Sequence, residues 1–383
     1  MYTLNNFNVR TFLGQYWQKK PLVIKQGFED FVEPLDENEL AGLSQEPDID
    51  SRIISNQDNN WQLNHGPFDD INALCIGAWS LLVQSVDHYI PEADALMRAF
   101  DFIPHWRMDD LMVSYSNKGA GVGPHLDQYD VFIIQGKGTR RWQVGLPAEF
   151  THVRPHRDLS QITEFEPVID QVLHSGDIIY IPANHPHNGV ALDACLNYSV
   201  GFRAPTQQEL LSSFADFALD KNLFQKRFTD EKIASRDFSG EVKIDEVSRF
   251  KNLLQQVLEK EHFSNWTAQF LSQSATHQGD DEQELEQFSI QEINQLIDDN
   301  TGFVRSLGIK PVFVEPQSTV REEFYFYIQG DEFSAPITSK QVVVDFLNQP
   351  VFNIYETIPE KHRVFFVQLL ARLVNAGYRY PEY

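Results

Sequence analysis

The sequence is poor in cysteine and in basic residues, and each shortage argues against a class of protein. Only two cysteines, Cys75 and Cys195, occur in 383 residues, and they form no CxxC pair. We therefore expect neither a disulfide framework nor a thiolate zinc site, and two reduced thiols suit a cytoplasmic protein. Lys and Arg number 31 against 55 Asp and Glu, a net charge of −24, which disfavours direct nucleic-acid binding and favours a basic partner.

Long apolar runs are also missing from the chain. No run approaches the roughly 18 residues that a membrane-spanning helix needs. Residues 1–7 contain no basic segment leading into an apolar stretch, so we expect no secretory signal. Apolar residues still make up 42% of the chain, which is enough for a packed core. The length predicts two or three domains.

Residues 1–205 have the pattern of a helix followed by many short strands. Residues 7–17 have helical spacing, and residues 79–89 are predicted to be a buried helix that ends at Pro91. From Leu111 onward, β-branched and aromatic stretches alternate with Gly and Pro turns. The predicted strands include residues 20–25, 130–135, 140–144, 177–181 and 197–202. Such spacing is typical of an all-β sandwich or barrel.

After Pro205 the pattern changes to amphipathic helices. Apolar residues recur at helical spacing in residues 208–223, 247–258 and 263–271, and these apolar faces need a partner. They either cover the barrel or build a dimer interface. Residues 273–286 are polar and acidic, which predicts a linker. Residues 206–286 are therefore treated as a second region.

Residues 287–383 are predicted to form a third unit that mixes helices with a small β-ribbon. The expected helices are 290–297, 339–347 and 361–376, and the expected strands are 312–314 and 323–328. This composition suggests a winged-helix-like module. Residues 289–383 carry eight Lys and Arg against twelve Asp and Glu, which disfavours DNA binding. We favour a structural or partner-docking role.

The chemically most informative residues are His125 and Asp127, followed far downstream by His187. On a strand, His-x-Asp places both side chains on one face, because side chains alternate with period two. A second histidine from a distant strand completes a 2-His-1-carboxylate triad, which leaves metal positions open, as in non-haem Fe(II) oxygenases. The glycines in residues 119–123 allow the backbone to approach such a site closely. The pattern therefore predicts a catalytic metal centre.

Other residues compete for the metal-binding role. A structural zinc site needs four protein ligands, often thiolates, and no cysteine lies near the motif, so Fe(II) fits better. His185 shares strand parity with His187 and remains an alternative ligand on spacing alone. His152 and His156 are four residues apart, but Pro155 argues against a helix there, and we interpret both as surface loop residues. The histidines given no role are His65, His88, His105, His174 and His262.

Arg140 is the candidate for binding an anionic cosubstrate. Strand alternation places Arg140 on the apolar face with Trp142 and Val144, and Arg141 on the wet face. An inward-facing arginine must be paired, and its planar fork suits a carboxylate such as that of 2-oxoglutarate. The alternative is a structural pair with an internal Asp or Glu. Weaker candidates for cosubstrate contacts, all on apolar strands, are Ser114, Ser116 and Asn197.

Five segments carry a family resemblance. They are residues 16–25, 79–84, 106–112, 121–132, which include Gly-Pro-His-Leu-Asp, and 197–205. Together they closely resemble bacterial ribosomal oxygenases of the JmjC/cupin type. The resemblance extends over essentially the whole chain, is densest over residues 104–205, and is thin over residues 225–310.

The resemblance implies a mixed α+β chain with a double-stranded β-helix, the JmjC or cupin jelly roll, in residues 1–205. It implies a helical dimerisation region in residues 206–286 and a winged-helix-like domain in residues 287–383. It also implies Fe(II) held by His125, Asp127 and His187 rather than His185, with 2-oxoglutarate and O2 as cosubstrates and Arg140 on the 2-oxoglutarate.

The substrate that the resemblance implies is an arginine of a large-subunit ribosomal protein, and the assembly it implies is a homodimer. Family members that hydroxylate histidine tend to have lysine at the position of Arg140, so Arg140 favours the arginine branch. Acidic residues near the mouth, such as Asp130, are candidates to meet the guanidinium group. The rival functions are a JmjC lysine demethylase and a non-catalytic cupin binding module.

Overall fold

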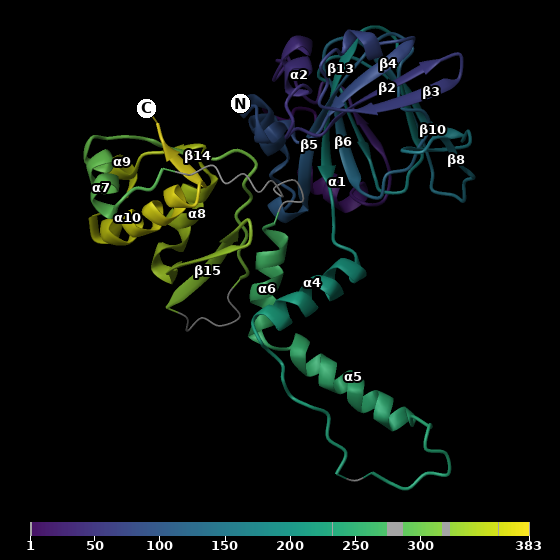
Figure 1. Cartoon of the computed structure of the whole chain (residues 1–383). Coiled ribbons are helices and arrows are strands. Elements are labelled where there is room, and N and C mark those ends of the chain that lie inside the picture. The colour runs from purple at the N-terminus through teal and green to yellow at the C-terminus, as the bar shows by residue number, and fades with distance from the viewer. Residues whose placement is uncertain (1, 232, 274–285, 316–321, 359, 383) are drawn as a thin grey trace. The chain divides into compact units, whose positions relative to one another are not determined.

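The structure, a computed structural model, describes residues 2–231, 233–273, 286–315, 322–358 and 360–382. The predicted linker, residues 273–286, lies almost entirely outside these ranges. Contacts divide the described chain into two compact units, one made mainly of the residues up to Ala204 and one mainly of those from Pro205 onward (Figure 1). Each unit has a hydrophobic core of its own.

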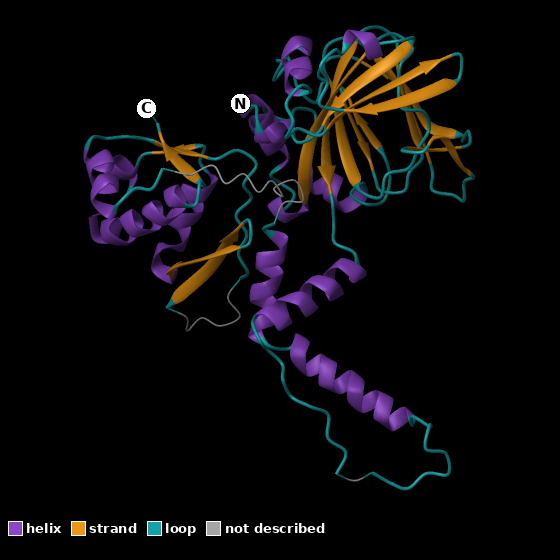
Figure 2. Ribbon diagram, in the orientation of Figure 1, coloured by secondary structure: helices purple, strands orange, loops and turns teal. Residues whose placement is uncertain are grey.

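The first unit is built mainly of antiparallel strands, as predicted (Figure 2). Its helices are α1 (Val9–Gln15), α2 (Glu37–Leu43) and α3 (Pro91–Met97). Its first strands are β1 (Leu22–Ile24), β2 (Ser51–Gln57), β3 (Asn60–His65), β4 (Ala78–Val83), β5 (Met108–Ser116) and β6 (Asp130–Gln135). The others are β7 (Arg140–Gly145), β8 (His152–His156), β9 (Leu159–Ile162), β10 (Pro167–Leu173), β11 (Ile178–Ile181), β12 (His187–Ala191) and β13 (Cys195–Phe202).

The strands form two facing sheets. The major sheet has eight strands in the order β1-β11-β6-β13-β5-β4-β2-β3, and the minor sheet has three in the order β10-β7-β12. One apolar cluster joins Val131 and Ile179 of the major sheet to Trp142 and Leu173 of the minor sheet, so the two sheets pack face to face. Strands β8 and β9 make a separate hairpin.

The opposite face of the major sheet is covered by the helices. Phe12 of α1, Leu40 of α2 and Leu96 of α3 belong to the same buried cluster as Leu111 and Phe132 of the sheet. Each such side chain contributes about 1.5–3 kcal/mol when fully buried. The helices therefore stabilise this face, and the face toward the minor sheet is left to form the site.

The helix predicted for residues 79–89 is wrong. This segment contains β4 and a single 3-10 turn, Val86–His88. Strand β4 pairs with both β2 and β5 and is buried on both faces at Ser80–Val83, so its apolar run shows no alternation. Periodicity cannot distinguish a fully buried strand from a buried helix. The strand predicted at residues 312–314 is also absent, because only Val312 forms a bridge, to Tyr327.

A buried polar cluster holds the start of β6. Asp130 is 1% exposed and accepts hydrogen bonds from Tyr180 Oη at 2.6 Å and from Gln18 Nε2 at 3.0 Å. It also forms an ion pair with Arg107, whose Nη2 lies 3.3 Å from Asp130 Oδ2. Asp130 is therefore an internal structural residue, and the expectation that it meets a substrate at the mouth is wrong.

We expect Asp130→Ala to lower the free energy of unfolding of the first unit by about 3 kcal/mol, because it leaves the largely buried charge of Arg107, whose side chain is 11% exposed, without its partner. Chemical denaturation measures this loss. Asp170→Ala is the control, since Asp170 pairs with the exposed Arg141 and its removal should change little. Equal stability of the Asp130 and Asp170 variants would contradict the structural role of Asp130.

The second unit begins with α4 (Gln207–Asp220), α5 (Ile244–Leu258) and α6 (Glu261–Leu271), close to the predicted helices. Neither α4 nor α5 has a buried residue, and apolar side chains such as Leu211 and Leu254 are exposed. In contrast, Trp266 of α6 is buried. None of the described helices combines the length and apolar composition needed to cross a bilayer.

The rest of the second unit has a compact core of its own. Its helices are α7 (Ile290–Asp298), α8 (Lys340–Asn348), α9 (Ile354–Thr357) and α10 (Glu360–Asn375). Its strands are β14 (Phe303–Arg305), β15 (Glu323–Ile328), β16 (Asp331–Pro336), β17 (Val351–Phe352) and β18 (Arg379–Pro381). The sheet β17-β14-β18 and the hairpin β15-β16 pack with the helices around Phe326, Phe346 and Phe366. The predicted helices and the strand at 323–328 are confirmed, whereas the winged-helix assignment stays a prediction.

Candidate active site

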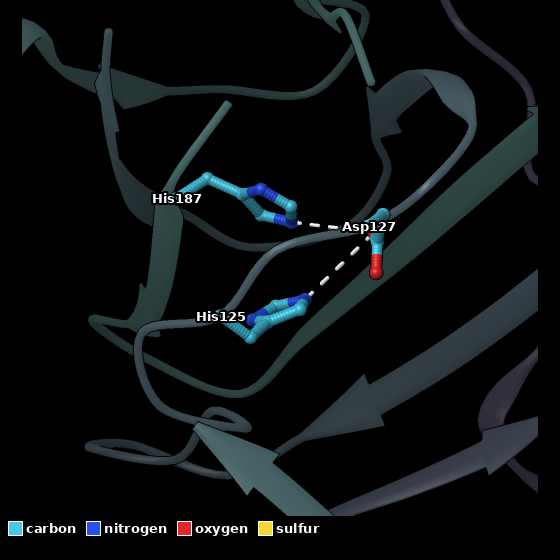
Figure 3. A group of neighbouring side chains, drawn as sticks. All are labelled: His125, Asp127 and His187. Carbon is cyan, nitrogen blue, oxygen red and sulfur yellow. Dashed lines mark ion pairs between the residues drawn. The ribbon is translucent and has the colours of Figure 1, made fainter. Parts of the chain in front are cut away.

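His125, Asp127 and His187 lie together in the first unit (Figure 3). One potential ligand atom from each residue lies within 4.8 Å of the others. Asp127 Oδ2 is 3.4 Å from His187 Nε2 and 3.9 Å from His125 Nε2. No other cluster of three or more His, Cys, Asp or Glu with this spacing occurs among the described residues. The structure thus brings together the three residues selected from the sequence.

The local geometry differs from the strand that the sequence suggested. His187 begins β12, but His125 forms only an isolated antiparallel bridge with His187, and Asp127 lies in the loop before β6. The bridge consists of two backbone hydrogen bonds, His125 N to His187 O at 3.0 Å and His187 N to His125 O at 3.1 Å. Asn184 N donates to Asp127 O at 2.7 Å. Backbone bonds between two distant segments therefore position all three side chains.

Both histidines are oriented through their second ring nitrogen. His125 Nδ1 is 2.9 Å from Gly123 O, and His187 Nδ1 is 3.0 Å from His185 O. A carbonyl oxygen can only accept, so each Nδ1 carries a proton, and each Nε2 is the ring nitrogen that faces the cluster. Metal-binding histidines are typically oriented in this way, by a hydrogen bond from the ring nitrogen that does not face the metal. His185 is buried but does not join the cluster, so it is not the third residue.

Burial and mutual charge shift the protonation of the three side chains. Burial, together with the field of His187, lowers the pKa of His125 to about 4. Burial alone would raise the pKa of Asp127, but the hydrogen bond to His187 and the fields of both histidines lower it to about 2. Burial opposes charging of His187, yet Asp127 outweighs it and raises the pKa of His187. At neutral pH the cluster offers an ionised carboxylate and a neutral His125, which are the forms that ligate metals.

The three side chains line a cavity of about 180 Å³ between the two sheets. The polar lining residues on strands include Arg140 on β7, Ser80 on β4, Ser114 on β5 and Asn197 on β13. Further lining residues are Arg52, Gln84, Asp110, Tyr129 and Asp158. A cavity with few polar groups on an apolar lining is the usual form of a small-molecule site.

Arg140 faces inward, as its strand parity predicted. It is 6% exposed, and its Nη2 donates a hydrogen bond to Ser116 Oγ. Burial lowers the pKa of Arg140. Its Nε is buried without a hydrogen-bond partner, and no described carboxylate forms an ion pair with it. The structural alternative, a pair with an internal Asp or Glu, is therefore not found in the described chain.

The other three polar candidates divide into two roles. Ser114 and Asn197 line the cavity, and Asn197 Nδ2 donates to Gln135 Oε1 at 2.9 Å. Ser116 instead lies behind Arg140, with its Oγ 2.7 Å from Ser80 Oγ. Ser116 therefore orients Arg140, while Ser114 and Asn197 are placed to contact a ligand.

Several cavity residues were not found from the sequence. Arg52 on β2 and Asp110 on β5 are brought together by strand pairing, whereas Tyr129 and Asp158 come from the loop before β6 and the turn after β8. Their individual neighbours in the sequence carry no motif, so no signal marked them. His152 and His156 lie on strand β8 rather than in a loop, which corrects their interpretation.

Gly189 is required beside His187 because of close packing. An added Cβ would lie 2.7–2.8 Å from three ring carbons of Trp142, its pairing partner on β7. We expect Gly189→Ala to displace β12, to cost about 1–3 kcal/mol in stability, and to weaken metal binding through His187. Gly201→Ala, also at the cavity but with its nearest atom 3.7 Å away, is the matched control. Unchanged metal affinity in the Gly189 variant would contradict this packing argument.

Two facing antiparallel sheets that enclose a His-Asp-His cluster and a buried arginine define a class of protein, the jelly-roll oxygenases with a facial triad. Residues 95–210 match the model of the JmjC domain.

The whole chain has relatives of known structure. The chain is 40% identical to the ribosomal protein uL16 3-hydroxylase of Escherichia coli strain K12. The alignment covers 97% of this chain and 97% of that relative. The X-ray structure of E. coli YcfD superposes on this chain with a TM-score of 0.90 and 39% sequence identity. The alignment covers 100% of both chains. The structure of E. coli YcfD in complex with cobalt and 2-oxoglutarate gives a TM-score of 0.87 at 37% identity, again over 100% of both chains. The chain therefore belongs to the JmjC family of ribosomal oxygenases.

Proposed function

We propose that this protein is an Fe(II)- and 2-oxoglutarate-dependent hydroxylase of an arginine side chain in a large-subunit ribosomal protein. The observation that carries the proposal is that the His-Asp-His cluster and the inward-facing Arg140, which has no carboxylate partner among the described residues, line one cavity. The similarity to the E. coli uL16 hydroxylase over 97% of both chains supports this choice of substrate. A ribosomal substrate also supports a cytoplasmic location.

The residues present fit the metal and the cosubstrate. Asp127, His125 and His187 supply one carboxylate oxygen and two Nε2 atoms, the donor set of the facial triad. When bound, Fe(II) with 2-oxoglutarate and O2 supplies the oxidising power to hydroxylate a C–H bond, with succinate and CO2 as the other products.

The protein's own residues bind, orient and exclude water. Arg140 would hold the far carboxylate of 2-oxoglutarate as a bidentate partner, and Ser116 fixes the guanidinium for that purpose. Ser114 and Asn197 would donate or accept further hydrogen bonds. Ile133 and Trp142 line the same cavity and keep it apolar, which strengthens each of these interactions.

Two carboxylates in the lining of the cavity support a cationic substrate side chain. Asp110 lines the cavity, and its Oδ2 accepts from Ser85 N at 2.9 Å. Asp158 also lines the cavity, from the turn between β8 and β9. These two carboxylates replace Asp130 as candidates for the guanidinium partner. The net charge of −24 steers a basic protein toward the molecule.

The experiment that tests the proposed reaction measures O2 uptake, succinate and formaldehyde with a basic ribosomal protein as substrate. A hydroxylase forms succinate and consumes O2 without releasing formaldehyde. Formaldehyde in proportion to succinate would support the lysine demethylase instead. Absence of both O2 uptake and succinate would support the non-catalytic binding module.

We further propose the division into residues 1–205, 206–286 and 287–383, with the central region forming a homodimer. Large apolar side chains on α4 and α5 are exposed in the single chain, including Leu211 at 73%, Leu219 at 75% and Leu254 at 68%. Exposed apolar faces of this kind are typical of association surfaces. Light scattering should give twice the chain mass of 44.2 kDa, and Leu211→Glu should lower that mass. A wild-type mass of one chain would contradict the dimer.

A further inference from the structure

Arg52 is a second arginine at the cavity, and the proposed reaction has not used it. It lies on β2 and lines the cavity with Asp110, Asp127 and Tyr129. Its Nε is buried and has no hydrogen-bond partner, and no described carboxylate forms an ion pair with it. A buried donor without an acceptor costs about 1–3 kcal/mol. The guanidinium group therefore brings to the cavity a positive charge that no ion pair with a described carboxylate neutralises.

Arg52 is connected to Asp110 through one amide. In the orientation that satisfies both of its ends, Gln84 accepts from Arg52 Nη2 at 3.3 Å and donates to Asp110 Oδ2 at 3.0 Å. These side chains come from β2, the end of β4 and β5, which are neighbours in the major sheet. Arg52 also interacts electrostatically with Asp127, His125 and Tyr129. Arg52, Asp110 and Asp127 therefore line one cavity, and Gln84 links Arg52 to Asp110.

A cavity with two carboxylates presents a selection problem for a cationic substrate. Both Asp110 and Asp127 attract a guanidinium group, and the side chain of Asp127 is 23% exposed. A guanidinium paired with Asp127 would compete with the metal and would carry nitrogen rather than carbon to the reacting position. Specificity of this kind needs a repulsive element as well as an attractive one.

We propose that Arg52 is the specificity-determining residue that provides this repulsion: it keeps the cationic end of the substrate side chain away from Asp127 and directs it to Asp110. This inference rests on the proposed function. It assigns Arg52 a role toward the substrate, with no contact to the metal.

The test compares full-length wild type with Arg52→Met, Arg52→Gln and Arg52→Lys. Arg52→Met and Arg52→Gln both remove the charge. Arg52→Gln provides a second neutral variant in case Arg52→Met does not fold. Arg52→Lys retains the charge. Arg141→Met is the control, because Arg141 is an exposed arginine on the outer face of β7, paired with Asp170. Two quantities are measured: the ratio of succinate formed to arginine hydroxylated, and the affinity for Mn(II) with and without an arginine-containing substrate peptide.

We expect the neutral variants to raise the ratio of succinate to product about tenfold, the scale of one polar interaction lost at a partly desolvated site. We expect the peptide to weaken Mn(II) binding in these variants and not in wild type, while Arg52→Lys and Arg141→Met behave like wild type. The inference would be overturned if a neutral variant kept the wild-type ratio of succinate to hydroxylated arginine and bound Mn(II) equally well with and without the peptide. It would also be overturned if Arg52→Lys showed the same ratio and the same Mn(II) affinity as Arg52→Met. A wild type that hydroxylates no arginine would overturn the proposed function as well.

Discussion

Replacing Asp127 with alanine is expected to abolish metal binding and 2-oxoglutarate turnover. Asp127 supplies the only anionic group of the cluster, and its Oδ2 lies within 4 Å of both histidine Nε2 atoms. Loss of a residue that merely supports a metal ligand typically costs 10–100-fold in affinity or activity, so loss of a ligand itself should exceed about a hundredfold. Calorimetric titration with Fe(II) under anaerobic conditions, or with Mn(II), measures the binding directly.

The histidines provide matched variants for the same prediction. His187→Ala should behave like Asp127→Ala, whereas His185→Ala should keep its metal, because His185 is buried nearby but lies outside the cluster. Asp127→Asn tests the charge with little change in shape. If Asp127→Ala bound metal with wild-type affinity, or His185→Ala alone lost it, the assignment of the centre would be wrong.

Replacing Arg140 with alanine is expected to raise the 2-oxoglutarate concentration for half-maximal turnover by about a hundredfold. Arg140 is 6% exposed, has a buried Nε without a partner, and lines the cavity of the cluster. Truncating one partner of a buried charged hydrogen bond costs about 2–5 kcal/mol, and each 1.4 kcal/mol is tenfold. Succinate formation measured against 2-oxoglutarate concentration gives the value.

Two variants separate the charge of Arg140 from its shape. Arg140→Lys keeps a cation but loses the planar fork, so its requirement for 2-oxoglutarate should fall between those of wild type and Arg140→Ala. Arg141→Ala, one residue later on the outer face of the same strand, should leave the requirement unchanged. An unchanged dependence in Arg140→Ala would mean that a different cation, with Arg52 the first to examine, binds the cosubstrate.

His125, Asp127 and Arg140 could be predicted because short local patterns carry them, whereas the choice of His187 over His185 depended on the family resemblance. The two-residue spacing of His125 and Asp127 and the strand parity of Arg140 both have direct consequences for side-chain direction. The parity argument is confirmed by β7, where Arg140 and Trp142 are buried and Arg141 is exposed. For His125 and Asp127 the pairing is correct but the reason differs, because Asp127 lies in a loop that backbone bonds from residues 184–187 hold in place.

Other parts of the fold and site depend on contacts between distant segments. Strand β4 was predicted as a helix because its partners β2 and β5 bury both faces and remove the alternation that marks a strand. Arg52 and Asp110 are 58 positions apart in the numbering and meet only through the order of strands β5-β4-β2. No local pattern in a single sequence encodes that order, so these lining residues of the cavity could not be predicted.

The most direct test of the central claim is mass spectrometry of the large-subunit ribosomal protein uL16 after incubation with this protein, Fe(II) and 2-oxoglutarate, with Asp127→Ala as the control. Fragmentation assigns any added oxygen to a residue. We predict the gain of one oxygen on an arginine with wild type and no gain with the variant. Succinate formation without any oxygen on an arginine, or equal gain with Asp127→Ala, would contradict the account.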